Sequence, residues 1–441
     1  CRFWSRWRSH AERLRPRFAS FPVFVMRLRL VSFLQSTCLL RAFSLVVLVC
    51  ALLAPVAHAQ TTHYVDGAAS GANDGSSWTN AFATLQQALS VATGNDQIWI
   101  AEGTYTPTAS TDRTASFRVN GQQNGLKVYG GFASGDASLS DRNPADHPVI
   151  LSGDLGSGVF GSRIKTYHVV TFDGRTSGPI TAGTVLDGVT ITGGQAFSVN
   201  TTDNYGAGIF CDGSGSGSEC SPTLSNIIVL GNEAEFGGGL FNSALNQGTS
   251  NPTIVNAVFS GNFARTGGGA IYNDGNGGTS SPTITNATFT NNFTRGSGGA
   301  ISNAAVNGGT SAPEITNTIL WGNRADNSGP EILNQGSAAP TIRYTLVQGQ
   351  DRTGSGAGNF DGTNTANAPR FADARGPDGQ EGTLDDDLRL AAGSPMFEGG
   401  DNAALDESAR GLDLNGDGDT NDTIQTDVAG ASRIENGTVD V

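Results

Sequence analysis

The chain has 441 residues, 61 of them glycine, with 15% charged residues and a formal net charge of −14. Glycine is about twice as frequent as in average proteins, and so few charges argue against a coiled coil or a charge-driven disordered chain. The acidic balance argues against nucleic acid as a partner.

Residues 26–59 have the three parts of a secretory signal peptide. An arginine-containing stretch comes first, an apolar run covers residues 42–56, and a small-residue cleavage site ends at Ala59. The apolar run is short for a transmembrane span, so a membrane anchor is the weaker alternative. Because the chain begins at Cys1 and not at Met, residues 1–25 are interpreted as upstream over-translation. We expect a secreted or cell-surface protein without a transmembrane helix after cleavage.

Removing residues 1–59 changes both the charge and the cysteine content. That segment holds nine Arg and one Glu, so the remaining chain has 17 basic and 39 acidic residues and a net charge of −22. Calcium is a natural partner for so many carboxylates. Of the five cysteines only Cys211 and Cys220 remain. An even pair in an exported chain predicts a disulfide, with two free thiols as the alternative.

Residues 60–96 are predicted to form an N-terminal cap. Thr84 and Gln87 have the spacing of a capping box, and apolar residues follow with helical periodicity up to Ala92. Gly94 then ends the helix. This short amphipathic helix is expected to cover the first repeat of the structure that follows, because a repeating structure exposes its core at its ends.

Residues 204–348 contain five similar segments, each with a proline just before a short apolar stretch. The prolines recur at steps of 30, 30, 31 and 27 residues, at Pro222, Pro252, Pro282, Pro313 and Pro340. Three apolar columns repeat with the same spacing. They are Leu224, Ile254, Ile284, Ile315 and Ile342; Val229, Phe259, Phe289, Leu320 and Val347; and Ile209, Leu240, Ile271, Ile301 and Ile332.

Three columns of asparagine lie between the apolar columns. The first is Asn226, Asn256, Asn286 and Asn317; the second is Asn232, Asn262, Asn292 and Asn323; the third is Asn242, Asn273, Asn303 and Asn334. Asparagine tolerates left-handed corners and can hydrogen-bond to its equivalent one repeat away. The columns therefore predict structural ladders.

Three short strands per repeat, each with an inward apolar residue, cannot close a core alone. Stacking successive repeats pairs like with like at about 4.8 Å. The sequence therefore predicts an all-β fold, a parallel β-helix over residues 97–348, right-handed as nearly all parallel crossovers are. Cys211 lies one repeat before Asn242 and is expected to precede it in the third asparagine column. We expect a monomer.

Several short motifs resemble those of exported bacterial right-handed β-helix proteins. In chain order they include Tyr64-Val-Asp-Gly67, Gly71-Ala-Asn-Asp-Gly-Ser-Ser-Trp78, Val128-Tyr-Gly-Gly-Phe132 and Ile150-Leu-Ser-Gly-Asp154. Gly268-Gly-Ala-Ile271 resembles polymorphic outer-membrane-protein repeats, and the tail, with Gly393-Ser-Pro395, resembles choice-of-anchor Q surface proteins. The resemblance implies an exported surface protein associated with the outer membrane, and little chemistry. Such proteins often carry a further anchoring segment, so the chain is expected to be truncated.

Residues 349–441 are predicted to be an acidic, loop-rich region. Oxygen-bearing side chains alternate there as in the first half of an EF-hand or dockerin calcium loop. The pattern fails at its twelfth position, Ile424, where Asp427 is the substitute. The predicted ligands of a structural calcium ion are Asp413, Asn415, Asp417, Asp419, Asn421 and Asp427. The alternative is a solvated acidic loop.

The outer face of the predicted β-helix is mostly Thr, Ser and Asn, with the aromatic residues Phe241, Tyr272 and Trp321. Aromatic residues on this face either contact sugar rings or take part in packing between loops. Arg265 and Arg295 are interpreted as solvated edge charges. We interpret the protein as a surface scaffold or adhesin that binds polysaccharide or a surface protein. The alternative is a polysaccharide lyase or glycoside hydrolase of pectate-lyase-like fold. No spacing identifies catalytic residues, and paired carboxylates within residues 150–230 would favour the enzyme.

Overall fold

The computed structural model describes residues 60–158, 162–198, 202–350, 356–406, 426–430, 432–435 and 438–441. The predicted leader, residues 1–59, lies outside these ranges, and Gln60–Val441 is one structural unit. Within the described ranges, no helix is long and apolar enough to cross a membrane.

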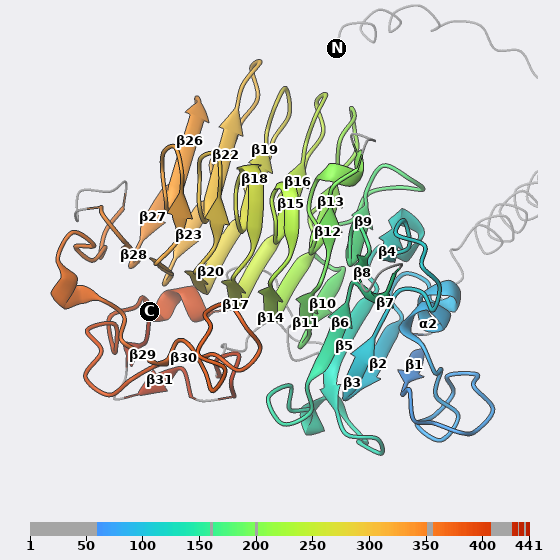
Figure 1. The fold of residues 1–441 in the computed structure, drawn as a ribbon. Coiled ribbons are helices and arrows are strands. Elements are labelled where there is room, and N and C mark those ends of the chain that lie inside the picture. The colour runs from blue at the N-terminus through green and yellow to red at the C-terminus, as the bar shows by residue number, and fades with distance from the viewer. Residues whose placement is uncertain are drawn as a thin grey trace, which may run out of the picture. The chain divides into compact units, whose positions relative to one another are not determined.

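Three parallel sheets run along the repeats, and Figure 1 shows their strands stacked side by side. The fourteen-stranded sheet follows the path β1 (Thr62–Val65), β2 (Gln97–Ala101), β5 (Lys127–Phe132), β10 (Val185–Asp187), β14 (Thr223–Leu230), β17 (Thr253–Ser260), β20 (Thr283–Thr290), β23 (Glu314–Thr316) and β27 (Thr341–Arg343). Its other strands are β3 (Gly103–Tyr105), β6 (Val149–Ser152), β11 (Thr190–Thr192), β24 (Ile319–Trp321) and β28 (Leu346–Val347).

The two smaller sheets complete each rung, which is one turn of the chain around the stack. The seven-stranded sheet consists of β4 (Phe117–Asn120), β9 (Val170–Asp173), β13 (Ile209–Asp212), β16 (Leu240–Ser243), β19 (Ile271–Asp274), β22 (Ile301–Ala305) and β26 (Ile332–Gly336). The five-stranded sheet consists of β12 (Gln195–Ala196), β15 (Glu233–Phe236), β18 (Phe263–Gly267), β21 (Phe293–Thr294) and β25 (Arg324–Ala325). The fold is a right-handed parallel β-helix.

The predicted apolar columns pair in register and form the core. Ile254 pairs with Ile284, Phe259 with Phe289, and Leu240 with Ile271. These residues belong to one buried cluster that continues into the upstream rungs. The Phe259 and Phe289 rings stack with centroids 5.0 Å apart. Like residues therefore meet like residues along the stack, as the repeat requires.

The N-terminal end of the stack is covered by the helix α2 (Leu85–Val91). Thr84 and Gln87 form the capping box, and Leu85 is buried in the main core cluster. β1 pairs in register with β2, so the fourteen-stranded sheet already begins within residues 60–96. The short 3-10 helices are η1 (Gly121–Gln123), η2 (Leu139–Asp141), η4 (Thr202–Asn204), η5 (Thr365–Asn367) and η6 (Asn402–Leu405).

The acidic C-terminal region packs against the outside of the fourteen-stranded sheet. It contains the antiparallel pairs β29 (Phe371–Asp373) with β30 (Asp387–Leu390) and β31 (Ile434–Glu435) with β32 (Thr438–Val439). A third antiparallel pair, β7 (Asp154–Ser157) with β8 (Arg163–Lys165), lies in the upstream half. Val255 of β17 is buried with Leu405 and Val439, and Ile319 with Met396 and Val441.

Candidate functional site

The first asparagine column places the bend in the strands of the fourteen-stranded sheet. Its four members adopt left-handed φ angles of 50°, 56°, 53° and 49°, which asparagine tolerates better than most residues. Nδ2 of Asn256 donates to Oδ1 of Asn226, and Nδ2 of Asn317 donates to Oδ1 of Asn286 at 3.0 Å. Asn226 in turn donates to the Asp187 carboxylate at 2.7 Å. This ladder therefore ends on an acid.

The same column holds the C-terminal region on the sheet. The Arg433 guanidinium donates to Oδ1 of Asn256, with Nε at 3.1 Å. The backbone N–H of Asp401 donates to Oδ1 of Asn317 at 2.8 Å, and Nδ2 of Asn317 donates back to the Asp401 carbonyl. Burial lowers the pKa of the Arg433 guanidinium to about 10.

The second asparagine column is buried and ends on Glu331. Nδ2 of Asn262 donates to Oδ1 of Asn292 at 2.9 Å, and the same contact joins Asn232 to Asn262 and Asn292 to Asn323. Where the next asparagine would stand, the Glu331 carboxylate accepts from the backbone N–H and Nδ2 of Asn323. Burial raises the pKa of Glu331 to about 8.

The third asparagine column begins next to the disulfide. Nδ2 donates to Oδ1 of the following member at 2.8 Å in each step, through Asn242, Asn273, Asn303 and Asn334. Cys211 pairs in register with Asn242 and forms a disulfide with Cys220, with the Cα atoms 5.7 Å apart. Among the described residues, Oδ1 of Asn242 is buried without a hydrogen-bond donor, because the disulfide stands where the preceding asparagine would be.

Most of the predicted calcium loop lies outside the described residues. Asp413, Asn415, Asp417, Asp419 and Asn421 fall in this part of the chain, and only Asp427 is described. Among the described side chains, no group of three or more His, Cys, Asp or Glu could hold a metal ion. The calcium site stays a prediction.

The aromatic residues expected on the outer face are largely covered. Phe241 is only 3% exposed, so of the two interpretations packing holds for it and contact with sugar does not. Tyr205, from the loop before β13, stacks on Phe241 at 4.7 Å, and Tyr272 stacks on its other side at 5.3 Å. Tyr272 and Trp321 are half-buried. Packing between a loop and the seven-stranded sheet accounts for Phe241 and Tyr272, whereas Trp321 of β24 packs against the cluster that contains Met396 and Val441.

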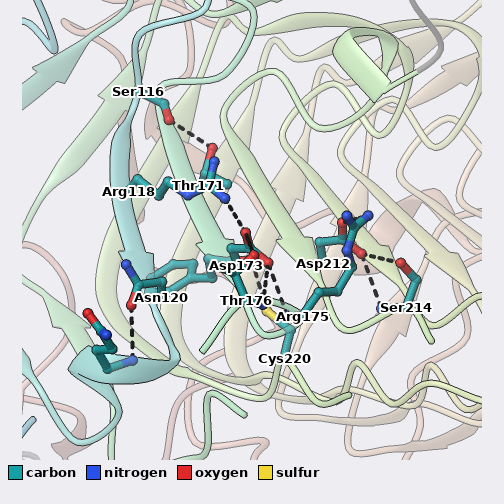
Figure 2. A network of polar contacts seen from close by, with 12 residues as sticks. Ser116, Arg118, Asn120, Thr171, Asp173, Arg175, Thr176, Asp212, Ser214 and Cys220 are labelled. Atoms are coloured by element: carbon teal, nitrogen blue, oxygen red, sulfur yellow. Dashed lines mark hydrogen bonds and ion pairs between the residues drawn. The ribbon is translucent and has the colours of Figure 1, made fainter. Parts of the chain in front are cut away.

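Two carboxylates lie side by side on the outside of the seven-stranded sheet (Figure 2). Asp173 ends β9 and Asp212 ends β13, and they are register partners. Arg118 of β4 forms an ion pair with Asp173, and Arg175 pairs with Asp212 at 2.9 Å. Both carboxylates are buried, whereas the two arginine side chains are 52% and 50% exposed.

Donors of the chain itself occupy both carboxylates. Asp173 accepts from the Thr176 hydroxyl at 2.7 Å and from the backbone amides after the strand. Burial alone would raise the pKa of Asp173, but these hydrogen bonds and the Arg118 charge lower it. Asp212 accepts from the backbone N–H and the hydroxyl of Ser214. With its lowered pKa, Asp173 is a poor general acid at neutral pH, and the donors that occupy both carboxylates fit a structural role.

The five-stranded sheet carries exposed arginines stacked on aromatic rings, which we call the arginine stripe. The guanidinium carbon lies over a ring at 3.8 Å for Arg265 on Phe197, 5.8 Å for Arg295 on Phe263 and 4.8 Å for Arg324 on Phe293. Glu235 lies 4.0 Å from Arg265. The predicted edge charges are thus exposed, and ring contacts fix their position.

An open groove of about 470 Å³ lies at one end of the arginine stripe. It is lined by Tyr167, Phe197, Ser198, Asn204, Glu235 and Arg265. The Arg113 guanidinium covers the Tyr167 ring at 4.4 Å. Rings, an amide, a carboxylate and a guanidinium around one concave space are the groups that recognise polar ligands such as sugars.

Sequence reasoning missed Glu331, Arg433 and the arginine partners of the two aspartates. Glu331 has a sequence signal, because it stands directly before Ile332, where the equivalent positions before Ile271 and Ile301 are alanine. Arg433 has no such sequence signal, because its partner Asn256 is 177 residues away.

No protein-family model and no curated protein matches the chain. Among solved structures, pectate lyase Pel9A is similar over 78% of this chain and 92% of its own, with 13% identity and a TM-score of 0.39. The pectin methylesterase from Aspergillus niger is similar over 70% of this chain and 90% of its own, with 13% identity and a TM-score of 0.26. A rhamnogalacturonan lyase is similar over 75% of this chain and 97% of its own, with 13% identity and a TM-score of 0.31. These similarities concern the fold alone, and the resemblance to choice-of-anchor Q proteins stays a prediction.

Proposed function

We propose that this chain is an exported β-helix scaffold, adhesin-like, that binds glycan in the groove of the five-stranded sheet. The groove carries the proposal, because Asn204 supplies an amide, Glu235 a carboxylate and Arg265 a guanidinium, beside the rings of Tyr167 and Phe197, each of which has a guanidinium over one face. Sugar hydroxyls need both donors and acceptors, and sugar ring faces pack on aromatic surfaces.

Export and display rest on the sequence. Residues 26–59 have the pattern of a signal peptide, and a disulfide suits an oxidising compartment. Association with the outer membrane follows from the choice-of-anchor resemblance. We propose that calcium, bound by the acidic loop that begins at Asp413, orders the C-terminal region. The partner is a polysaccharide or a glycan-bearing surface protein.

Retention on immobilised polysaccharides tests the binding proposal. The purified protein is expected to be retained on at least one polymer of a panel of acidic and neutral glycans. The double variant Phe197→Ala/Arg265→Ala is expected to lose at least tenfold in affinity. Arg343→Ala is the matched control, because Arg343 is an exposed arginine on the fourteen-stranded sheet. The proposal fails when no polymer retains the protein, or when the double variant binds like the control.

The second candidate is a polysaccharide lyase or glycoside hydrolase. Its supporting observation is the in-register pair Asp173 and Asp212 beside Arg118 and Arg175. Assays for new unsaturated or reducing ends on the same panel distinguish the two functions. Sustained turnover that Arg118→Ala and Arg175→Ala abolish would favour the enzyme. An absence of turnover together with retention would support the scaffold.

A further inference from the structure

The arginine stripe continues beyond the groove of the five-stranded sheet. Arg265 lines the groove, whereas Arg295 and Arg324 lie on the next two rungs. Phe263 pairs in register with Phe293, and Phe293 with Arg324, so the three arginines belong to consecutive rungs about 4.8 Å apart. A long ligand that lies along the stack therefore meets one guanidinium on each rung.

Two of these guanidinium groups keep their donors free. Arg295 and Arg324 are exposed, and among the described residues neither has a carboxylate within 4.0 Å or a hydrogen bond from its side chain. A ring lies against one face of each planar group, Phe263 at 5.8 Å and Phe293 at 4.8 Å. This stacking leaves the N–H groups at the edge of the plane, where a carboxylate accepts two parallel hydrogen bonds. The rings thus hold the arginines in place, and the guanidinium edges are available to an anion.

Most of the described carboxylates near the stripe already have a cation. Glu235 lies 4.0 Å from Arg265, and Glu233 of β15 lies 3.5 Å from Nζ of Lys165. Asp326 directly follows β25 and is exposed. Two unpaired arginines therefore face one aspartate, and the local charge is positive. The chain after residue 59 has a net charge of −22, but salt screens charges beyond about 8 Å, so the local excess decides.

We propose that the arginine stripe binds a polyuronate, a linear polysaccharide with carboxylates on its sugar units. This ligand class rests on the proposed function, because the groove holds one part of the polymer at Arg265. Arg295 and Arg324 each bind a uronate carboxylate farther along the stack, since a planar carboxylate matches the guanidinium fork. An exposed ion pair contributes little by itself, so the affinity comes from several units of one polymer that bind together.

Biolayer interferometry of the full protein on matched polymers tests the proposal. Polygalacturonate, polymannuronate and hyaluronate are the polyuronate probes, and the methyl ester of each has the same backbone without the charge. Dextran sulfate supplies a different anion. At least one polyuronate is expected to bind, at least tenfold more tightly than its methyl ester and more tightly than dextran sulfate.

Two variants with opposite expected effects locate the binding. Arg295→Gln/Arg324→Gln removes both charges and is expected to weaken polyuronate binding at least tenfold. Asp326→Asn removes the nearby negative charge and is expected to strengthen binding at least twofold. Arg343→Gln is the matched control, an exposed arginine on the fourteen-stranded sheet, and is expected to bind like the parent. All four positions are exposed, so these variants are expected to fold.

The outcomes separate the polyuronate from the proposed function. Equal binding of a polyuronate and its ester, tighter binding of dextran sulfate, or unchanged affinity in Arg295→Gln/Arg324→Gln overturns the polyuronate as the ligand. In each of these cases, binding that Phe197→Ala/Arg265→Ala weakens still supports the groove as a glycan site. When no polymer binds, both proposals fail.

Discussion

The upstream rungs, up to β13, and the downstream rungs, from β14 onward, satisfy their buried polar groups in different ways. Downstream, neutral asparagines bond to their equivalents 30 or 31 residues away. Upstream, ion pairs such as Arg142–Asp187 and Arg118–Asp173 join unlike segments. An amide side chain both donates and accepts hydrogen bonds, so a column of amides can pair its own donors and acceptors at any length. A carboxylate only accepts, so each acid needs a cation of its own, as Arg118 beside Asp173 and Arg175 beside Asp212, and a column of acids alone would repel.

Removal of Arg142 is the largest perturbation that the comparison predicts. Asp187 is fully buried, and Arg142 is its cationic partner. Arg142→Ala leaves that charge with only the Ser225 and Asn226 donors, and we expect a loss of about 3–5 kcal/mol in the free energy of unfolding. Arg163→Ala, which breaks a more exposed pair with Asp154, is expected to cost less than about 1 kcal/mol in chemical denaturation. Equal losses would contradict the distinction between buried and exposed pairs.

Breaking a downstream ladder is expected to have the next largest effect. Nδ2 of Asn292 donates to the carbonyls of Phe259 and Thr290 and to Asn323. Asn292→Ala removes these three buried side-chain hydrogen bonds, and we expect a loss of about 3 kcal/mol in the free energy of unfolding. Asn327→Ala, at an exposed position, is the control and should change the melting temperature little. A similar shift in both variants would mean that the ladder does not stabilise the fold.

The disulfide lies at the boundary between the two regions. Replacing it with asparagine at position 211 tests whether the third asparagine column can be extended upstream. Cys211→Ala/Cys220→Ala is expected to lose about 2–3 kcal/mol, because the disulfide closes a short loop. Cys211→Asn/Cys220→Ala adds a donor for the unpaired Oδ1 of Asn242 and should recover about 1 kcal/mol of that loss. Denaturation of both variants measures the difference. No recovery would show that the ladder cannot grow into the upstream rungs.

Glu331 is expected to give the smallest effect, which depends on pH. Burial raises its pKa from 4.5 to about 8, so the folded state holds a proton that the unfolded state releases. This contribution is complete below about pH 4.5 and is lost as the pH rises through about 8. Glu331→Gln stays neutral and should flatten the stability profile between these values, so that its difference from the parent grows as the pH rises from about 4.5 to 8. An unchanged profile would contradict the raised pKa.

The fold could be predicted from the sequence because it repeats. The columns of Ile254, Phe259 and Asn256 recur at constant spacing, so each observation is made several times, and their registers follow. The position of Cys211 before Asn242 could be predicted for the same reason.

The candidate site could be predicted only in part, because its contacts do not repeat. Arg118 and Asp173 are 55 residues apart, and Arg433 meets Asn256 across 177 residues. No spacing encodes either pair. Phe241 was placed on the outer face, but its cover could not be predicted, because Tyr205 comes from an irregular loop. The downstream repeats thus reveal architecture, while the irregular segments determine which surfaces remain open.

The direction of the ladders gives the β-helix an electrical polarity along its axis. In the second asparagine column every Nδ2 points toward later rungs, and the last bond reaches Glu331. In the first column Asn256 and Asn226 point the opposite way, toward Asp187. These two rows of amide dipoles thus present their positive ends to a carboxyl group, as the N-terminus of an α-helix does to an anion. The first and second asparagine columns therefore form two antiparallel rows of dipoles within one stack, and each row ends at a carboxyl group.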